Sequence, residues 1–180
     1  DIDFLMRQLR LEESDLYRID GLLNMASLFE LYGALEHPHL KDAPFQPALH
    51  PQVVDSDNIF EAIRQGDFMV LHPYDSFQPV VEFVETAATD PDVIAIKQTL
   101  YRATDNSPIV RALRQAAEKG KQVLALIELK ARFDEQANIK FAKDLEESGV
   151  NVVYGLLGLK THCKTSMVLR REDGRIRSYM

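Results

Sequence analysis

The sequence has a single cysteine, Cys163, and no run of eighteen consecutive apolar residues. A lone cysteine excludes an internal disulfide framework and is compatible with a reducing cytoplasm. Without a long apolar run no segment is expected to span a membrane, and the first ten residues lack the basic stretch and apolar core of a signal peptide. The rest of the composition, 46% hydrophobic and 27% charged, is ordinary for a globular protein.

Basic residues are scarce in the first half of the chain. Residues 1–94 hold 5 lysines and arginines against 18 acidic residues, whereas residues 95–180 hold 16 against 10. The net charge of −7 therefore combines an acidic half with a basic half. The basic half is a candidate for binding a small or linear anion, although charges scattered over solvated faces would give the same totals.

The first third of the sequence predicts an irregular helical segment and a linker. Residues 1–10 and 22–36 have helical spacing of apolar residues, and the following stretch, 36–57, contains four prolines. Its three histidines, including the His37-Pro38-His39 triplet, are interpreted as exposed loop residues. Because Asp1 is not an initiator methionine and the last residues stop within an expected strand, we expect a fragment of a longer protein.

From residue 56 onward, strand and helix patterns alternate. A helix is expected to begin at Ser56 or Asp57 and to run through Gly66. The further expected strands are 67–73, 92–102, 121–133 and 151–155, and the further expected helices are 76–89, 107–120 and 134–149. Residues 158–171 and 171–180 are read as two strands joined at Asp173-Gly174, a hairpin dipeptide.

This alternation predicts the fold class. Strands separated by helices form βαβ units with a mainly parallel sheet, and the closing hairpin makes the sheet mixed. We therefore expect an α/β fold, a mainly parallel, mixed sheet with helices on both faces, after the irregular helical segment.

Two arginines follow strands that should be neighbours in this sheet. Ligands of open α/β sheets bind beyond the carboxyl ends of the strands, and Arg102 and Arg132 lie at the ends of successive expected strands. Two guanidiniums at one edge suit the bidentate binding of phosphate oxygens. The structural alternative is that each arginine pairs with a local acid such as Glu128 or Asp134.

A histidine among lysines follows one unit later, in GLKTHCK (158–164). In a strand, His162 and Lys164 would point to the same face, where a neutral imidazole can attack phosphorus while cations stabilise the transferred oxygens. Zinc needs about four N or S ligands, and no CxxC or HxxxH accompanies His162-Cys163. An inert sheet histidine is the remaining alternative.

Four motifs together resemble the polyphosphate kinase family, whose members build inorganic polyphosphate from ATP. They are HPYDSF (72–77), IKQTLYR (96–102), LKARFDEQANI (129–139) and GLKTHCK (158–164). The resemblance covers order and spacing over about residues 55–180. It implies that residues 1–50 are the end of a preceding head domain with a linker, and that residues 51–180 are a truncated first C-terminal catalytic domain with a phospholipase D-like fold.

The resemblance also implies roles for individual residues. His162 matches the histidine that is phosphorylated during catalysis, and Arg102 and Arg132 match arginines associated with magnesium-bound phosphates. Because a guanidinium has no lone pair to give, both arginines are expected to reach Mg²⁺ only through phosphate. The expected supporting phosphate contacts are Lys97, Lys160 and Lys164.

The implied cofactor is Mg²⁺, and the implied partners are ATP, ADP and inorganic polyphosphate, with no nucleic acid. The parent protein is expected to be a homo-oligomeric cytoplasmic enzyme, and membrane association is left open. A following domain would supply a second histidine, and in-line transfer needs both half-sites. The present chain is therefore expected to be inactive or nearly so by itself.

One residue departs from the superfamily pattern, and two further questions stay open. The phospholipase D superfamily uses an H-x-K-x4-D motif, but Leu169 occupies the aspartate position here, which weakens a phosphodiesterase interpretation. A module that binds polyphosphate without chemistry is the other alternative. The role of His72 in HPYDSF does not follow from the motif.

Overall fold

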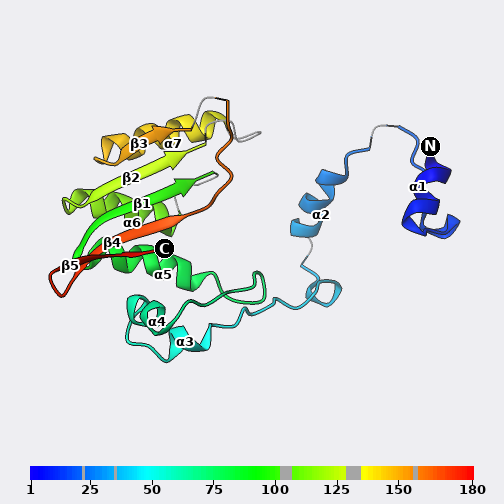
Figure 1. Ribbon diagram of the computed structural model, residues 1–180. Helices are drawn as coiled ribbons and strands as arrows, with labels where there is room; N and C mark the ends of the chain where they lie inside the picture. The colour runs from blue at the N-terminus through cyan, green and yellow to red at the C-terminus, as the bar shows by residue number, and fades with distance from the viewer. Residues whose placement is uncertain (22, 35, 102–106, 129–134, 156–157) are drawn as a thin grey trace. The chain divides into compact units, whose positions relative to one another are not determined.

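The computed structural model describes residues 1–21, 23–34, 36–101, 107–128, 135–155 and 158–180, with only the backbone described for 135–138. The chain forms two compact units, Asp1–Phe45 and Gln46–Met180 (Figure 1). In the described residues no helix is both long enough and apolar enough to cross a membrane.

The first unit contains short helical elements and no buried residue among those described. Its elements are α1 (Ile2–Leu9), η1 (Glu13–Asp15), η2 (Met25–Ser27), α2 (Leu28–Ala34) and η3 (Pro38–Leu40). The irregular helical character agrees with the sequence, but the single helix expected over 22–36 is instead a 3₁₀ turn followed by the short α2. Large apolar side chains such as Phe4 and Phe29 are exposed, so this unit has no core of its own.

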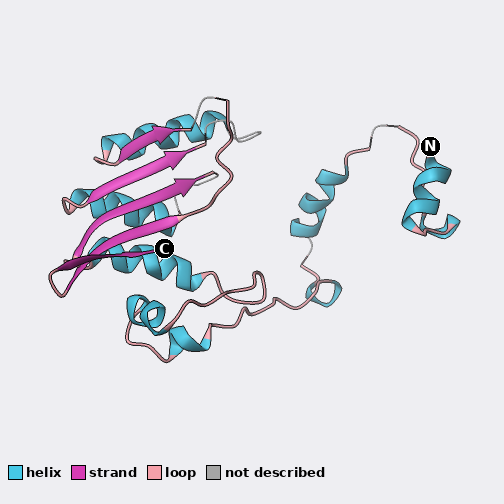
Figure 2. Cartoon of the chain, viewed as in Figure 1, coloured by secondary structure: helices cyan, strands magenta, loops and turns pink. Residues whose placement is uncertain are grey.

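The second unit is built around a five-stranded sheet with the order β3-β2-β1-β4-β5 (Figure 2). Its strands are β1 (Val93–Leu100), β2 (Gln122–Ile127), β3 (Asn151–Tyr154), β4 (Ser166–Glu172) and β5 (Arg175–Tyr179). β1, β2 and β3 are parallel, whereas β4 is antiparallel to both β1 and β5. This confirms the mixed sheet and the predicted neighbourhood of β1 and β2.

Five helices accompany the sheet: α3 (Pro51–Val54), α4 (Ile59–Gln65), α5 (Gln78–Thr89), α6 (Pro108–Glu118) and α7 (Glu135–Glu147). Proline at the first position of α6 is favoured because its missing N–H has no helical partner there. α4 begins one or two residues later than its predicted caps, Asp57 and Ser56, would place it. The side chain of Asn58, rather than Ser56 or Asp57, accepts the hydrogen bond from the Glu61 N–H.

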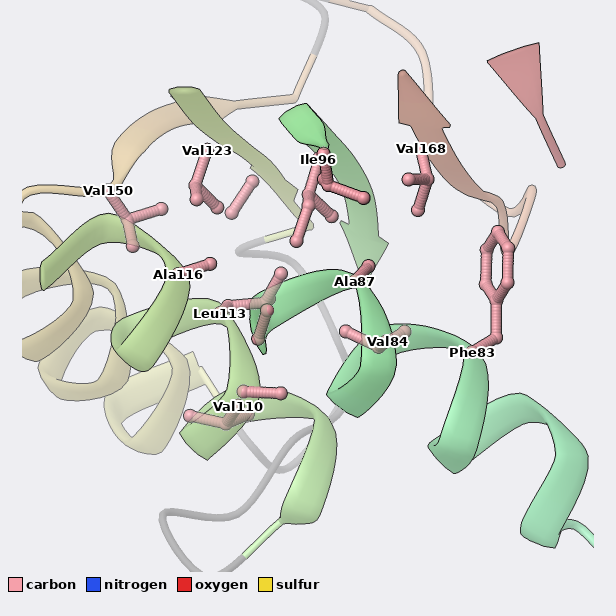
Figure 3. Packing of buried hydrophobic residues seen from close by; sticks show 14 of the residues in the cluster. Phe83, Val84, Ala87, Ile96, Val110, Leu113, Ala116, Val123, Val150 and Val168 are labelled. Carbon is pink, nitrogen blue, oxygen red and sulfur yellow. The ribbon is translucent and has the colours of Figure 1, made fainter. Parts of the chain in front are cut away.

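The core lies between the sheet and α5, α6 and α7, all on one face of the sheet (Figures 1 and 3). Ile96, Val123 and Val168 from three strands pack there with Val84 of α5 and Leu113 of α6. Helices were expected on both faces of the sheet, whereas α5, α6 and α7 cover one face (Figures 1 and 3). Both crossovers, β1-α6-β2 and β2-α7-β3, move the same way across the sheet, and right-handed crossovers in one direction place their helices on one face.

One expected strand is absent, and another begins later than expected. Residues 67–71 have no regular secondary structure and lead into a turn at 72–74, and Met69 and Leu71 are 85% and 65% exposed. Residues 158–165 are also irregular, and β4 starts only at Ser166. In contrast, the hairpin is confirmed, because Asp173 and Gly174 join β4 to β5 with φ of 48° and 74°, as a tight turn of this kind requires.

Candidate active site

The candidate site lies at the carboxyl ends of β1 and β2. These strands end side by side, since Leu100 pairs with Ile127 in the ladder. β4 runs antiparallel to β1, with Ser166 opposite Gln98, so the segment that leads into β4 arrives at the same edge. The histidine segment, residues 161–165, therefore lies at the carboxyl ends of the parallel strands, where α/β sheets bind ligands.

His162 is exposed and packs against an aromatic ring from β1's end. The rings of Tyr101 and His162 meet edge to face, with centroids 5.3 Å apart and planes at 89°. Lys164 Nζ lies 4.5 Å from the centroid of the same Tyr101 ring and donates a hydrogen bond to the His162 carbonyl oxygen over 2.6 Å. Tyr101 thus holds an imidazole and an ammonium group together.

His162 and Lys164 are neighbours, but not for the reason that the sequence predicted. The two residues were expected to share the face of a strand, but residues 158–165 form no strand. Contacts of both side chains with Tyr101 bring them together instead. His162 is therefore not a sheet residue, in contrast to one alternative from the sequence.

Two threonines hold the end of the histidine segment that joins β4. The Thr99 N–H donates to the Thr165 carbonyl oxygen over 2.9 Å, and the Thr165 N–H donates to Thr99 Oγ1 over 2.7 Å. A side-chain oxygen therefore replaces the next backbone acceptor of the ladder, which ends regular pairing just before Ser166. Cys163 Sγ also lies 2.7 Å from Thr165 Oγ1.

The other end of the segment contacts a buried carboxylate. Glu128 directly follows β2 and is 4% exposed, and its Oε2 accepts a hydrogen bond from the Thr161 N–H over 2.8 Å. His162 and Lys164 consequently lie between two points of attachment, one at the end of β2 and one on β1.

The structure locates three of the predicted phosphate contacts. Lys160 and Lys164 are exposed on the approach to β4. Lys97 is also exposed, but it lies within β1, in register with Leu124 and Met167. Arg102 and Arg132 lie outside the described residues, so the predicted arginine clamp stays a prediction.

His72 lies in a turn on the approach to α5. Its Nδ1 donates to the Asp75 carbonyl oxygen over 2.9 Å, and its ring packs edge to face on Phe77 at 5.3 Å. Asp75 Oδ2 accepts in turn from the Leu71 N–H. These contacts assign His72 a part in shaping the turn.

The described residues do not offer a ready-made metal cage. They contain no group of three or more histidine, cysteine, aspartate or glutamate side chains that could hold an ion. Among the described residues, His162 and Cys163 therefore have no further histidine, cysteine or carboxylate partners for zinc. A magnesium ion held by the described residues would need phosphate oxygens or water to complete its shell, which is how Mg²⁺ is usually bound.

Tyr101 and Glu128 were not singled out as site residues by the sequence. Tyr101 directly precedes Arg102 in the IKQTLYR motif, which is the only local signal for it. Glu128 was considered only as an ion-pair partner for an arginine. Both act through contacts with a segment more than thirty residues away, which local patterns do not report.

Together these features define an α/β domain whose mixed sheet carries an exposed histidine at the carboxyl ends of its parallel strands. The family model described as "Polyphosphate kinase C-terminal domain 1" matches residues 58–180. The chain therefore belongs to the polyphosphate kinase family.

Curated relatives and a solved structure agree with this assignment. The polyphosphate kinases of Mycobacterium tuberculosis and Mycobacterium marinum are each 54% identical over 182 aligned positions, which cover 99% of this chain and 24% of theirs. The crystal structure of polyphosphate kinase from Porphyromonas gingivalis matches 93% of this chain and 27% of that chain, with a TM-score of 0.70 and 34% identity. The chain thus spans about a quarter of the length of these relatives.

Proposed function

We propose that this chain is part of a polyphosphate kinase that transfers the γ-phosphoryl group of ATP to His162 and then to inorganic polyphosphate, reversibly. Besides the relatives' names, one observation carries the proposal. His162 is exposed at the ligand-binding edge of the sheet and shares the Tyr101 ring with the ammonium group of Lys164.

The proposed transfer occurs in two displacements. A ring nitrogen of His162 attacks the γ-phosphorus with its lone pair, the bond from phosphorus to the β–γ bridging oxygen breaks, and ADP leaves with that electron pair. A terminal oxygen of polyphosphate then attacks the same phosphorus, and the N–P electron pair returns to the imidazole. Lys164, beside His162, supplies positive charge near the transferred oxygens.

The remaining phosphate contacts are proposed from the family pattern and the chemistry of the side chains. Arg102 and Arg132 would bind phosphate oxygens directly, with Lys97 and Lys160 as further cations. Magnesium would enter with the nucleotide phosphates, because the described residues hold no cluster of metal ligands. When bound, Mg²⁺ neutralises phosphate charge.

The domain organisation is likewise a proposal. Residues 1–50 would be the end of a head domain with a linker. Residues 51–180 would be the first C-terminal catalytic domain, with a fold that resembles phospholipase D. A second catalytic histidine from another domain and assembly into homo-oligomers would complete the enzyme. The exposed apolar side chains of the first unit support this, since such surfaces are normally covered.

Labelling of the full-length protein with γ-phosphate-labelled ATP tests the proposal. Wild-type protein is expected to acquire acid-labile, base-stable phosphate, and His162→Ala is expected to acquire none. His39→Ala, which removes an exposed histidine of the first unit, serves as the control and should label normally. Undiminished labelling of His162→Ala would overturn the assignment.

The excess of basic residues in the second half favours one further candidate, an anion-binding module without chemistry. In that case, salt-sensitive binding of polyphosphate should persist in His162→Ala and be lost in a double variant, Arg102→Ala with Arg132→Ala, while no phosphohistidine forms in the wild type. Phosphodiester hydrolysis is the least supported alternative, because Leu169 occupies the aspartate position of the phospholipase D motif and supplies no carboxylate. Leu169 lies within β4, paired with Ala95 and Ser178. A hydrolysis assay excludes or detects it.

A further inference from the structure

Glu128 is a buried carboxylate at the end of a core strand. It is the one charged residue among the described residues that are buried, at 4% exposure. Burying a carboxylate costs several kcal/mol unless hydrogen bonds or charges compensate it. A fold retains such a group at this position only if its contacts there offset that cost.

The contacts of Glu128 connect three segments. Its N–H donates to the Leu100 carbonyl oxygen over 3.1 Å, which ties the ends of β1 and β2 together. Its Oε2 accepts from the Thr161 N–H over 2.8 Å. A Cβ at Gly155, just after β3, would lie 3.8 Å from the same oxygen. The carboxylate therefore lies close to both described parts of the connection from β3 to β4.

We propose that Glu128 is a positioning residue that fixes His162 for phosphoryl transfer through its hydrogen bond to the backbone of Thr161. This inference rests on the proposed function. The bonded N–H belongs to the residue next to His162, so its loss moves the imidazole directly. Glu128 has further interactions, and the proposal concerns the Thr161 bond alone.

The need for this bond follows from how the histidine segment is attached. Thr165 is held by Thr99 at one end, and the Thr161 N–H is held by Glu128 at the other. Between them, His162 and Lys164 are exposed and contact the half-buried Tyr101. With one end released, the segment pivots about Thr165, and a displacement of about 1 Å at a reacting group can lower a rate about a hundredfold.

Two substitutions separate hydrogen-bond acceptance from mere occupancy of the site. Glu128→Leu removes the acceptor, whereas Glu128→Gln retains a carbonyl oxygen of similar reach. Glu146→Leu is a matched control, because Glu146 is an exposed carboxylate that accepts from the Tyr154 hydroxyl near the same end of the domain. All three are made in the full-length protein and compared by thermal unfolding.

The first measurement is amide hydrogen exchange of the peptide that contains Thr161. Exchange at Thr161 is expected to accelerate in Glu128→Leu and to stay near the wild-type rate in Glu128→Gln and Glu146→Leu. This readout needs no catalysis, so it tests the Glu128–Thr161 link even if the wild type forms no phosphohistidine. Unchanged exchange in Glu128→Leu would overturn the inference.

The second measurement is the single-turnover rate of His162 phosphorylation. Glu128→Leu should lower this rate by about tenfold to a hundredfold, with a smaller change in KM for ATP, and Glu128→Gln should restore most of it. Wild-type speed in Glu128→Leu, or a folded Glu128→Gln as slow as Glu128→Leu, would contradict positioning through this hydrogen bond. If the wild type itself carries no label, the proposed function fails instead.

Discussion

The charged side chains at the two ends of β4 have different surroundings. At its start, His162 and Lys164 are exposed, and the Lys164 ammonium group contacts an aromatic ring and a backbone carbonyl. At its end, Arg170 lies among three carboxylates. Its Nε is 2.8 Å from Asp90 Oδ2, its Nη1 is 2.8 Å from Glu172 Oε1, and its Nη2 is 3.5 Å from Asp92 Oδ2.

The end of β4 forms a connected network. Tyr179 of β5 donates a 2.5 Å hydrogen bond to Glu172 Oε1, and the Arg170 guanidinium lies over the Phe60 ring at 5.5 Å. Hydrogen bonds with Asp90 and Glu172 raise the pKa of Arg170. These charges satisfy one another and hold the hairpin to the rest of the sheet.

The difference shows how one strand serves two purposes. Charges matched by partners in the protein contribute to stability, whereas cations that rest on an aromatic surface at a strand end are available to an anionic ligand. Substitutions at the end of β4 should therefore act on unfolding, and substitutions at its start on phosphate chemistry.

The largest effect on stability is expected from Arg170→Met. It removes the 2.8 Å cation contact of Asp90 and of Glu172, whose side chains are 12% and 8% exposed, and leaves Glu172 only its longer contacts with Arg64 and Arg177. This should cost about 2–4 kcal/mol given partial solvent access. Urea unfolding followed by circular dichroism measures this loss. Arg177→Met is the matched control, since Arg177 approaches Glu172 at 3.5 Å but is 56% exposed; equal losses in the two variants would remove the contrast with Arg170.

A smaller loss of folding stability is expected when the pH is lowered. Burial raises the pKa of Glu172, but hydrogen bonds from Tyr179 and Arg170 outweigh it and bring the pKa below its ordinary value of 4.5. The stabilisation by ionised Glu172 is therefore present above that value and is lost as the pH falls through the lower, folded-state pKa.

Unfolding titrations from about pH 6 to about pH 3 measure this dependence. Glu172→Gln should be less stable than the wild type at neutral pH, and the difference should shrink in acid. A constant difference across the range would mean that Glu172 does not titrate in the network.

The smallest effect on stability, and a large one on chemistry, is expected from Lys164→Ala. Its exposed contact with Tyr101 is worth about 0.5–1 kcal/mol at most. If Lys164 lies beside the transferred oxygens as proposed, its loss should slow the proposed His162 phosphorylation by about tenfold or more. Lys143→Ala, at an exposed position of α7, should change neither quantity, and an equal slowing there would indicate a general charge effect.

Much of the fold was predictable because it depends on local patterns. β-branched apolar runs predicted β1, β2 and β3, and Asp173-Gly174 predicted the hairpin. The expected strand at 67–73 was wrong, since apolar residues alone do not supply a pairing partner, and Met69 is exposed. The strand expected over 158–171 forms only from Ser166 onward, since the Thr99 side chain takes the N–H of Thr165.

For the site, the sequence by itself determined the reactive groups, because imidazole and ammonium chemistry are properties of single residues and the antiparallel hairpin is encoded locally. Only the tertiary structure decided which residues support His162. Tyr101 and Glu128 reach it from β1 and β2 because strand order brings their ends to one edge of the sheet. That order depends on pairing and packing between residues far apart in the chain, which leave no periodic signal in the sequence around any one of them.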